Sequence, residues 1–266
     1  MYKKKTNNEQ FFFLTNKFNL KIKPIIIAHR GESLDAPENT LAAINLAWQR
    51  NADAVEIDVH LTKNDQIVVI HDYNTARTGN QNKEIKTSTL DELKSINVGN
   101  TEYPGEKIPI LNEVFATVPS DKKLIIEIKT GDEIIPRLIK EVNNAKLKKD
   151  QIEFIGFDFR TMVKIKNALP QQKVLWLPEL RYFWLNKIFP YYIKKVILKT
   201  IENNLDGLDL QTSGMLNKEL ISEIKSANLL VYIWTEDDPE KARDYFEMGV
   251  DGITTNRAGW LKGRLI

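Results

Sequence analysis

The stretch AVEIDVHLTKNDQIVVIHD, residues 54–72, holds two short apolar runs, and side chains that can do chemistry stand toward the end of each. A Glu–x–Asp pair lies within the first run, and His71 directly follows the second. Two other runs repeat the arrangement, because His29 follows IIIA and Glu127 lies in LIIEIK. In a parallel α/β barrel the C-terminal ends of all strands open onto one face, so we expect these groups to converge on one pocket.

Short runs rich in Val, Ile and Leu alternate with segments of helical period, which is typical of a parallel sheet covered by helices. Nine strands are predicted, at residues 25–28, 54–59, 66–70, 124–128, 152–157, 172–177, 205–210, 229–234 and 250–254. The second and third share a helix-free turn at Lys63, Asn64 and Asp65, so we expect a hairpin-like excursion there. The pattern predicts a TIM (β/α)8 barrel.

Helices are expected between the strands. One begins at Pro37 and Glu38, because a proline loses no hydrogen bond in the first turn and a negative charge there meets the helix dipole. Two more are predicted at residues 218–227 and 239–248, the latter ending at Gly249.

No linker rich in Gly, Pro or Ser divides the chain, so residues 1–266 are expected to form a single domain in which residues 1–23 are an N-terminal extension. Residues 72–123 are too long for an ordinary βα loop, and we expect a small insertion there, before the strand that carries Glu127. The insertion is predicted to hold a helix at residues 90–95 and to wall or cover the pocket.

Composition excludes several classes of function. The chain has 266 residues, 42% of them apolar, which is enough for a sizeable core. Its formal charge of +2 comes from 38 basic and 36 acidic side chains that are intermixed, so nucleic acid is not an expected partner. The absence of cysteine excludes disulfides, thiolate metal sites and a cysteine nucleophile, but suits either a reducing or an oxidising compartment.

The N-terminal region does not read as a secretory signal. Its apolar cluster, residues 11–14, is shorter than the roughly 7–15 residues of a signal h-region. No run reaches the roughly 18–20 apolar residues of a membrane span. We therefore expect a cytoplasmic location, or a secreted or periplasmic one if a signal has been removed, with no integral span. The oligomeric state is not indicated.

The carboxylates suggest a metal site. Glu56 and Asp58 project to the same side of one strand, and Glu127 and Lys129 to the same side of another. Any one of these acids alone is more often a solvated strand end, but three together resist ionising unless a cation neutralises them. An all-oxygen set suits Mg²⁺ or Ca²⁺, so a hard divalent ion is the predicted cofactor.

Two of the three histidines directly follow apolar strands. His29 and His71 suit general acid and base roles, one accepting a proton from the attacking oxygen and the other protonating the leaving alkoxide. Either alone is more often a packed or capping residue, so the prediction depends on the pair, and which of them is the acid stays open. His60 is expected to lie further along the loop, in a supporting or surface role.

Two cations accompany these groups. A guanidinium such as that of Arg30 can hold two phosphoryl oxygens, and Lys129 adds a point charge, so the substrate is expected to be anionic. Taken alone, either cation is more often a surface ion-pair partner. Metal ligands, acid–base histidines and phosphate-binding cations together predict a metal-dependent phosphodiester hydrolase.

These motifs resemble those of the glycerophosphodiester phosphodiesterase family over nearly the whole chain. They are HRGESLDAPENT at 29–40, EIDVHLTKND at 56–65, HD at 71–72, IPIL at 108–111, IEIK at 126–129 and DGITTNRAG at 251–259. The resemblance implies a TIM barrel that binds Ca²⁺ or Mg²⁺ and cleaves a small-molecule glycerophosphodiester to glycerol 3-phosphate and an alcohol such as choline or ethanolamine.

By position, the resemblance also assigns roles. The metal ligands are Glu56, Asp58 and Glu127; the acid–base pair is His29 and His71; the phosphate-binding cations are Arg30 and Lys129. Substrate-binding positions also fall on Glu38 and Asn39, in the PEN motif, and on Trp234, as an apolar wall beside the glycerol. For Trp234 a plain core aromatic is an equal alternative.

The chain departs from the family pattern at two places. WTEDD places Glu236 and Asp237 near the mouth, where they would favour a cationic head group or face solvent. Asn256, Arg257 and Ala258 stand where the family often has DRP. Neither departure touches the predicted metal ligands or histidines.

Residues 175–199 interleave aromatic and basic residues. The favoured interpretation is a strand and a helix packed on the barrel, and the alternative is an amphipathic surface for peripheral membrane contact. The latter gives weak support to the alternative function, a lysophospholipase D-type or cyclising phosphodiesterase. A non-catalytic binding module is disfavoured because both histidines are present.

Overall fold

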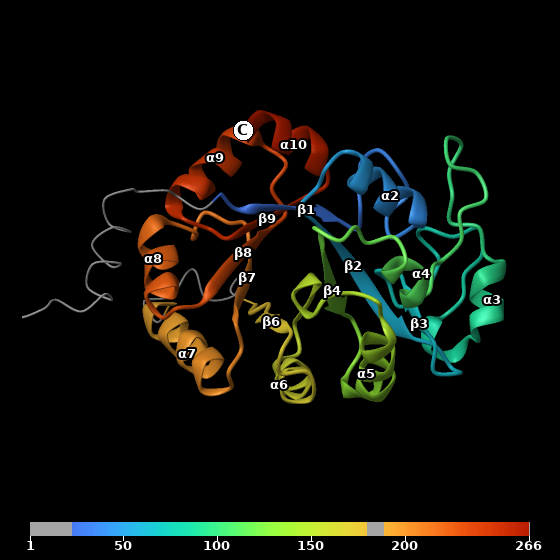
Figure 1. Cartoon of the computed structure of the whole chain (residues 1–266), viewed down its shortest axis with the longest axis horizontal. Helices are drawn as coiled ribbons and strands as arrows, with labels where there is room; N and C mark the ends of the chain where they lie inside the picture. The colour runs from blue at the N-terminus through green and yellow to red at the C-terminus, as the bar shows by residue number, and fades with distance from the viewer. Residues whose placement is uncertain (1–22, 180–188, 266) are drawn as a thin grey trace, which may run out of the picture.

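Eight parallel strands close into a barrel in the computed structural model, which describes residues 23–179 and 189–265 (Figure 1). They are β1 Ile25–His29, β2 Ala54–Leu61, β4 Lys123–Ile128, β5 Ile152–Gly156, β6 Lys173–Trp176, β7 Gly207–Gln211, β8 Leu230–Trp234 and β9 Gly252–Thr255. The neighbours run β1-β9-β8-β7-β6-β5-β4-β2, and pairing of β1 with β2 closes the ring. The predicted TIM barrel is confirmed.

The ninth strand, β3 Ile67–Val69, lies outside the ring. It pairs antiparallel with β2, Val59 opposite Val69 and Leu61 opposite Ile67. The tight connection at Lys63, Asn64 and Asp65 is therefore the predicted hairpin.

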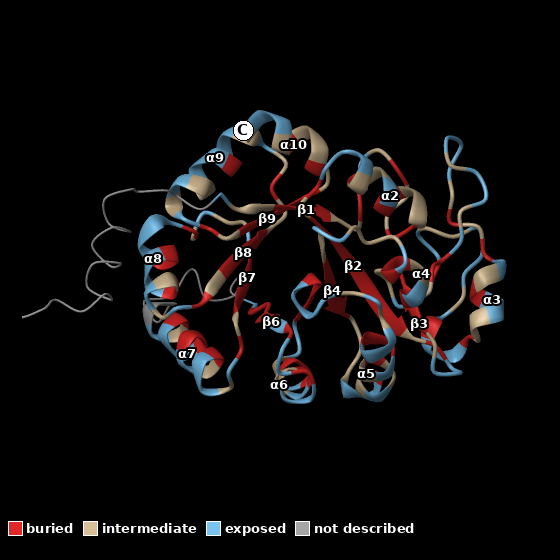
Figure 2. Ribbon diagram, viewed as in Figure 1, coloured by how far each residue is buried: buried red, intermediate tan, exposed pale blue. Residues whose placement is uncertain are grey.

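Helices lie around the barrel, and all but one of the described α-helices pack apolar side chains against its core (Figures 1 and 2). They are α2 Leu41–Gln49, α3 Leu90–Ser95, α4 Leu111–Phe115, α5 Ile135–Asn144, α6 Phe159–Ala168, α7 Phe189–Glu202, α8 Lys218–Ser226, α9 Pro239–Met248 and α10 Ala258–Leu265. Local signals place several ends. The Asn217 side chain accepts from the Leu220 N–H at the start of α8, and Gly249, with φ 98°, ends α9 where predicted.

The predicted start of the first helix is wrong. Helix α2 begins at Leu41, three residues after Glu38, because the Thr40 hydroxyl caps it by accepting from the Ala43 N–H. Asn39 has φ 57°, a left-handed conformation that cannot continue into a helix. Pro37 and Glu38 instead shape the turn between β1 and α2.

The segment at residues 72–123 forms a small unit beside β3. Helix α3 lies at the predicted residues, and Figure 1 shows it at the outer edge of the molecule, beyond β3. Its apolar residues form a cluster with those of the β3 region: Val68, Ile70, Ile85, Leu93, Ile96, Val98 and Ile108. Among the described residues of the segment, only Tyr73 lines the cavity that contains Glu127, so this unit borders that cavity at one side.

A layer of apolar side chains fills the lower half of the barrel. Its buried members are Ile27, Ala54, Ile125, Ile155, Leu175, Leu177 and Tyr232. Ala54 and Ile125 each stand two residues before a carboxylate on the same face of the strand, at Glu56 and Glu127. The apolar layer therefore lies directly beneath the carboxylates, and the site opens toward the C-terminal ends of the strands.

The segment at residues 175–199 is described only in part, since residues 180–188 lie outside the described ranges. Most of the predicted N-terminal extension, residues 1–22, also lies outside them. Helix α7 buries Ile193 and Val196 against the barrel, which agrees with the favoured interpretation. It leaves Tyr191 and Leu198 exposed, at 74% and 56% of their surfaces, so peripheral membrane contact stays a prediction.

Among the residues described, no helix combines the length and the apolar composition needed to cross a bilayer.

Candidate active site

Three carboxylates meet at the mouth of the barrel. Glu56 and Asp58 lie on β2, and Glu127 lies on the neighbouring strand β4, directly opposite Asp58. All three are buried, and one oxygen of each lies within 4.8 Å of an oxygen of the other two. The structure therefore brings together the residues that the sequence analysis proposed as metal ligands.

Each carboxylate is held by the protein through one oxygen. Glu56 Oε2 accepts the Arg30 backbone N–H at 2.9 Å, Asp58 Oδ2 accepts from Asn39 Nδ2 at 2.8 Å, and Glu127 Oε1 accepts from Lys129 Nζ at 2.8 Å. The second oxygens of Glu56 and Asp58 are buried without a hydrogen bond, although Lys129 Nζ lies 3.4 Å from Asp58 Oδ1. Buried oxygens that are oriented and left open suit a hard cation.

Glu56 and Glu127 are harder to ionise in this cluster than isolated carboxylates, because each is buried and repelled by a neighbouring carboxylate. Burial, and repulsion from Asp58 and Glu127, raise the pKa of Glu56 well above its ordinary value. Burial and repulsion from Asp58 raise the pKa of Glu127 to about 7, although Lys129 opposes this. A divalent cation would restore ionisation, so the three residues fit the predicted Mg²⁺ or Ca²⁺ site.

The turn after β1 aims Arg30 at this cluster. Arg30 and Gly31 are both left-handed, with φ 57° and 83°. A Cβ on Gly31 would lie 2.5 Å from the carbonyl carbon of Ala43 in α2, so only glycine allows this approach. The turn directs the Arg30 N–H to Glu56 and places its Nε 3.2 Å from Asp58 Oδ2.

His29 is held by an amide. Its Nδ1 lies 2.7 Å from Asn256 Oδ1, while Asn256 Nδ2 donates to Asp237 Oδ2 at 2.8 Å. Because Asp237 fixes which way the amide points, the Asn256 oxygen faces the ring and His29 Nδ1 must donate. Burial and the nearby Arg30 charge lower the pKa of His29, so its Nε2 keeps a free lone pair.

His71 is held by a carboxylate. Its Nδ1 lies 2.7 Å from Asp72 Oδ1, and Asp72 Oδ2 accepts from Arg77 Nε at 2.7 Å. Burial of Asp72 opposes ionisation, but the hydrogen bonds from Arg77 and His71 outweigh it and lower the pKa of Asp72 to about 2. The imidazole is therefore paired with an ionised partner.

His60 occupies a different place from the one expected. It lies within β2, 2% exposed, and not further along the loop. Its Nε2 donates to the His71 carbonyl at 3.0 Å. The role is nevertheless a supporting one, because this hydrogen bond holds the backbone beneath the His71 ring.

Glu38 and Asn39 contact the charged groups of the site. Glu38 accepts from Arg30 at 2.8 Å and from both terminal nitrogens of Arg77 at 2.7 Å. Burial opposes its ionisation, yet the Arg77 and Arg30 contacts hold the pKa of Glu38 at about 2. The buried Asn39 amide bonds to Asp58 through both its nitrogen and its oxygen.

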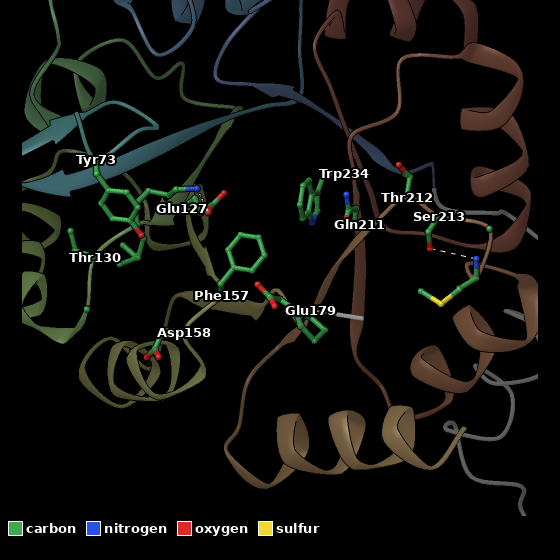
Figure 3. Close-up of a pocket in the computed structure, with 16 residues that line it drawn as sticks. Tyr73, Glu127, Thr130, Phe157, Asp158, Glu179, Gln211, Thr212, Ser213 and Trp234 are labelled. Atoms are coloured by element: carbon green, nitrogen blue, oxygen red, sulfur yellow. Dashed lines mark hydrogen bonds and ion pairs between the residues drawn. The ribbon is translucent and has the colours of Figure 1, made fainter. Parts of the chain in front are cut away.

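A cavity of about 1400 Å³ opens beside the carboxylates (Figure 3). Glu127, Lys129, Phe157 and Trp234 line it, and Figure 3 shows Glu127, Phe157 and Trp234 around one space. The Phe157 and Trp234 rings meet edge to face, with centroids 5.9 Å apart. Trp234 thus forms part of a cavity wall.

The two added acids are not free at the mouth. Glu236 is 7% exposed and accepts from the Asp238 N–H. Asp237 accepts from the Asn256 backbone and side chain and from the Thr255 hydroxyl. Neither expectation, a free acid for a cationic head group or one facing solvent, describes Asp237, which instead fixes Asn256.

Sequence reasoning assigned no supporting role to four of these residues, namely Asp72, Arg77, Asp237 and Asn256. Asp237 and Asn256 stand at the two departures from the family motif, and this was the available signal. Arg77 gave no such signal, because it lies outside the quoted motifs and only its partners, Glu38 and Asp72, lie within them.

Three carboxylates that could hold a hard cation and two imidazoles, at the C-terminal end of a parallel barrel, point to a class: the TIM-barrel phosphodiester hydrolases. A model of the glycerophosphoryl diester phosphodiesterase family matches residues 29–259. The chain therefore belongs to this family and is an enzyme of it, as the resemblance predicted.

Relatives agree along nearly their full length. The glycerophosphodiester phosphodiesterase of Caldanaerobacter subterraneus subsp. tengcongensis is 31% identical over 88% of this chain and 95% of its own. Lysophospholipase D GDPD1 of Homo sapiens is 26% identical over 86% of this chain and 82% of its own.

Solved structures share the fold. A phosphodiesterase of Oleispira antarctica, in complex with the product sn-glycerol-3-phosphate, has a TM-score of 0.80 and 25% identity, covering 91% of this chain and 97% of its own. A glycerophosphodiester phosphodiesterase of Thermotoga maritima has a TM-score of 0.74 and 25% identity, covering 91% and 98%.

Proposed function

We propose that this protein cleaves glycerophosphodiesters to glycerol 3-phosphate and an alcohol in a metal-dependent reaction with histidine acid–base catalysis. One observation carries the proposal. The carboxylates of Glu56, Asp58 and Glu127 converge at the mouth of the barrel, and Glu56 and Asp58 each keep one oxygen without a hydrogen bond. His29 and His71 are each held at the same mouth by a hydrogen bond to Nδ1.

Glu56, Asp58 and Glu127 would hold Mg²⁺ or Ca²⁺, which supplies positive charge to the non-bridging phosphate oxygens. Arg30 and Lys129 add fixed charge on either side of the cluster. Glu38 and Asn39 support substrate binding indirectly, because they orient Arg30 and Asp58. Trp234 walls the space beside the glycerol.

The Nδ1 partners suggest which histidine is the base. Both rings are held at Nδ1, so Nε2 is the nitrogen that each can present to substrate. A neutral amide holds His29, and burial and the Arg30 charge lower the pKa of this ring, whereas a carboxylate of lowered pKa holds His71. His29 then takes the proton from the attacking oxygen, and His71 gives its proton to the alkoxide as the phosphorus–oxygen bond breaks.

The cavity favours a second candidate, a lysophospholipase D-type or cyclising reaction. Its volume of about 1400 Å³ exceeds the roughly 300–1,000 Å³ of ordinary ligand pockets. Phe157, Pro178 and Met215 give it apolar walls, so it has room for an acyl chain beside the phosphate. Attack by a glycerol hydroxyl in place of water would yield a cyclic phosphate.

A substrate panel tests these alternatives. Glycerophosphocholine, glycerophosphoethanolamine, glycerophosphoinositol and lysophosphatidylcholine are each assayed with Mg²⁺, with Ca²⁺ and with chelator, and the products are read by phosphorus NMR. We expect glycerol 3-phosphate from the first three, and loss of turnover in chelator. Full turnover in chelator would contradict metal dependence. A cyclic phosphate, or turnover confined to lysophosphatidylcholine, would favour the second candidate.

A further inference from the structure

Arg77 makes three charge-assisted hydrogen bonds although it does not line the cavity. Its Nε donates to Asp72, and its two terminal nitrogens donate to the two oxygens of Glu38, all at 2.7 Å. Its side chain is 48% exposed and belongs to the segment outside the barrel. A planar guanidinium that donates to both Asp72 and Glu38 holds these two carboxylates at a fixed separation and orientation.

The contacts of Arg77 continue in both directions into the site. On one side Glu38 binds Arg30, whose Nε lies 3.2 Å from Asp58. On the other side Asp72 binds the His71 ring. Acidic and basic side chains therefore alternate from the proposed metal ligand Asp58 to Asp72, which holds the His71 ring, and Arg77 is the member that joins the two halves.

Asp72 and His71 need such an anchor. Their side chains are 29% and 31% exposed, so packing encloses neither of them fully. The His60 hydrogen bond fixes only the backbone of His71. The direction of the His71 ring thus depends on Asp72, and that of Asp72 on Arg77.

We propose that Arg77 is a positioning residue that holds Asp72, and through it the general acid His71, at the leaving-group side of the reaction. This rests on the proposed function, which assigns the acid role to His71. In this arrangement Arg77 contacts Asp72 and Glu38 and acts on the reaction only through them, so its loss should lower kcat far more than it changes KM.

The chemistry of the leaving group separates this role from a general structural one. An alkoxide leaving from an alkyl diester needs a proton as the bond breaks. A p-nitrophenolate leaves as a stable anion and does not. Misplacing the acid should therefore slow the alkyl substrate and spare the aryl one.

The test compares Arg77→Lys and Arg77→Ala on glycerophosphocholine and on the p-nitrophenyl diester of glycerol phosphate. Lysine keeps the positive charge but cannot donate to Asp72 and to both oxygens of Glu38 in the planar arrangement of a guanidinium. We expect kcat on glycerophosphocholine to fall about 10- to 100-fold in both variants, with the aryl diester slowed less than about threefold. Arg243→Ala is the matched control, since Arg243 is also 48% exposed and is paired with Glu240.

Each outcome is decisive. Equal losses on both substrates, or no loss on glycerophosphocholine, would overturn the inference. Thermal melting checks the fold, and if Arg77→Ala does not fold, Arg77→Lys gives the result. His71→Ala is run on the same pair. If it spares the aryl diester and the Arg77 variants do not, the acid role stands and the inference fails; if it slows both equally, both fail.

Discussion

At the scale of single residues, each histidine is defined by what holds its Nδ1. Replacing either His29 or His71 by Ala removes a proposed proton-transfer group while leaving its partners in place. We expect each variant to lose at least about a hundredfold in kcat, the usual scale of acid–base catalysis, with an unchanged circular dichroism spectrum. Wild-type turnover in both variants would refute the assignment.

Asn256 should matter nearly as much, because its oxygen selects the protonated nitrogen of His29. Asn256→Ala frees the ring to rotate and to change tautomer, and we expect kcat to fall about 10- to 100-fold. Ser33→Ala is the control. Ser33 donates to the same oxygen, at 3.2 Å, but does not hold the ring. Equal losses in the two variants would contradict this view of Asn256.

The candidate site was predictable where its residues lie on strands. Glu56, Asp58 and Glu127 alternate with apolar residues, so the side chain's face follows from the sequence. The partners were not predictable in this way. Asn256 reaches His29 across 227 positions of the chain, and nothing in either local stretch predicts that contact.

At the scale of elements, the turn between β1 and α2 depends on Gly31. Gly31→Ala forces alanine into a left-handed conformation and places its Cβ against the backbone of Ala43. We expect a loss of about 3 kcal/mol in the free energy of unfolding, measured by denaturant titration. Gly105→Ala separates the two causes, since Gly105 has φ 81° but open space around it, and should lose only about 1 kcal/mol. Equal losses would mean that the contact with α2 costs nothing.

Elements were predicted best where local chemistry decides them. Each predicted strand overlaps an observed one, because β-branched apolar runs bounded by turns have few other solutions. The start of α2 was misplaced because Asn39 is drawn into a left-handed turn where its amide binds Asp58, a tertiary contact that overrides the helix signal of Pro37.

At the scale of the whole molecule, burying three carboxylates together destabilises the folded state when they are ionised. Glu127 has a pKa of about 7 when folded, against about 4.3 in an unfolded chain. A folded pKa above the unfolded one means that the stabilisation is complete below about pH 4 and is lost as the pH rises toward 7. Glu56 is shifted in the same direction. Glu38 and Asp72 act oppositely, but only as the pH falls toward about 2.

In chelator, the free energy of unfolding should therefore decline between about pH 4 and 7, by on the order of 3 kcal/mol from Glu127. Saturating Mg²⁺ or Ca²⁺ should abolish that decline, because the cation binds the ionised carboxylates of the folded state and not of the unfolded chain. The gain in Tm on adding metal should thus grow with pH. Glu127→Gln is the control, since it removes one of the two titrating groups and should reduce the dependence in chelator to the part that Glu56 contributes. A metal-induced gain in Tm that is the same at pH 5 and pH 7 would contradict a cation held by these carboxylates.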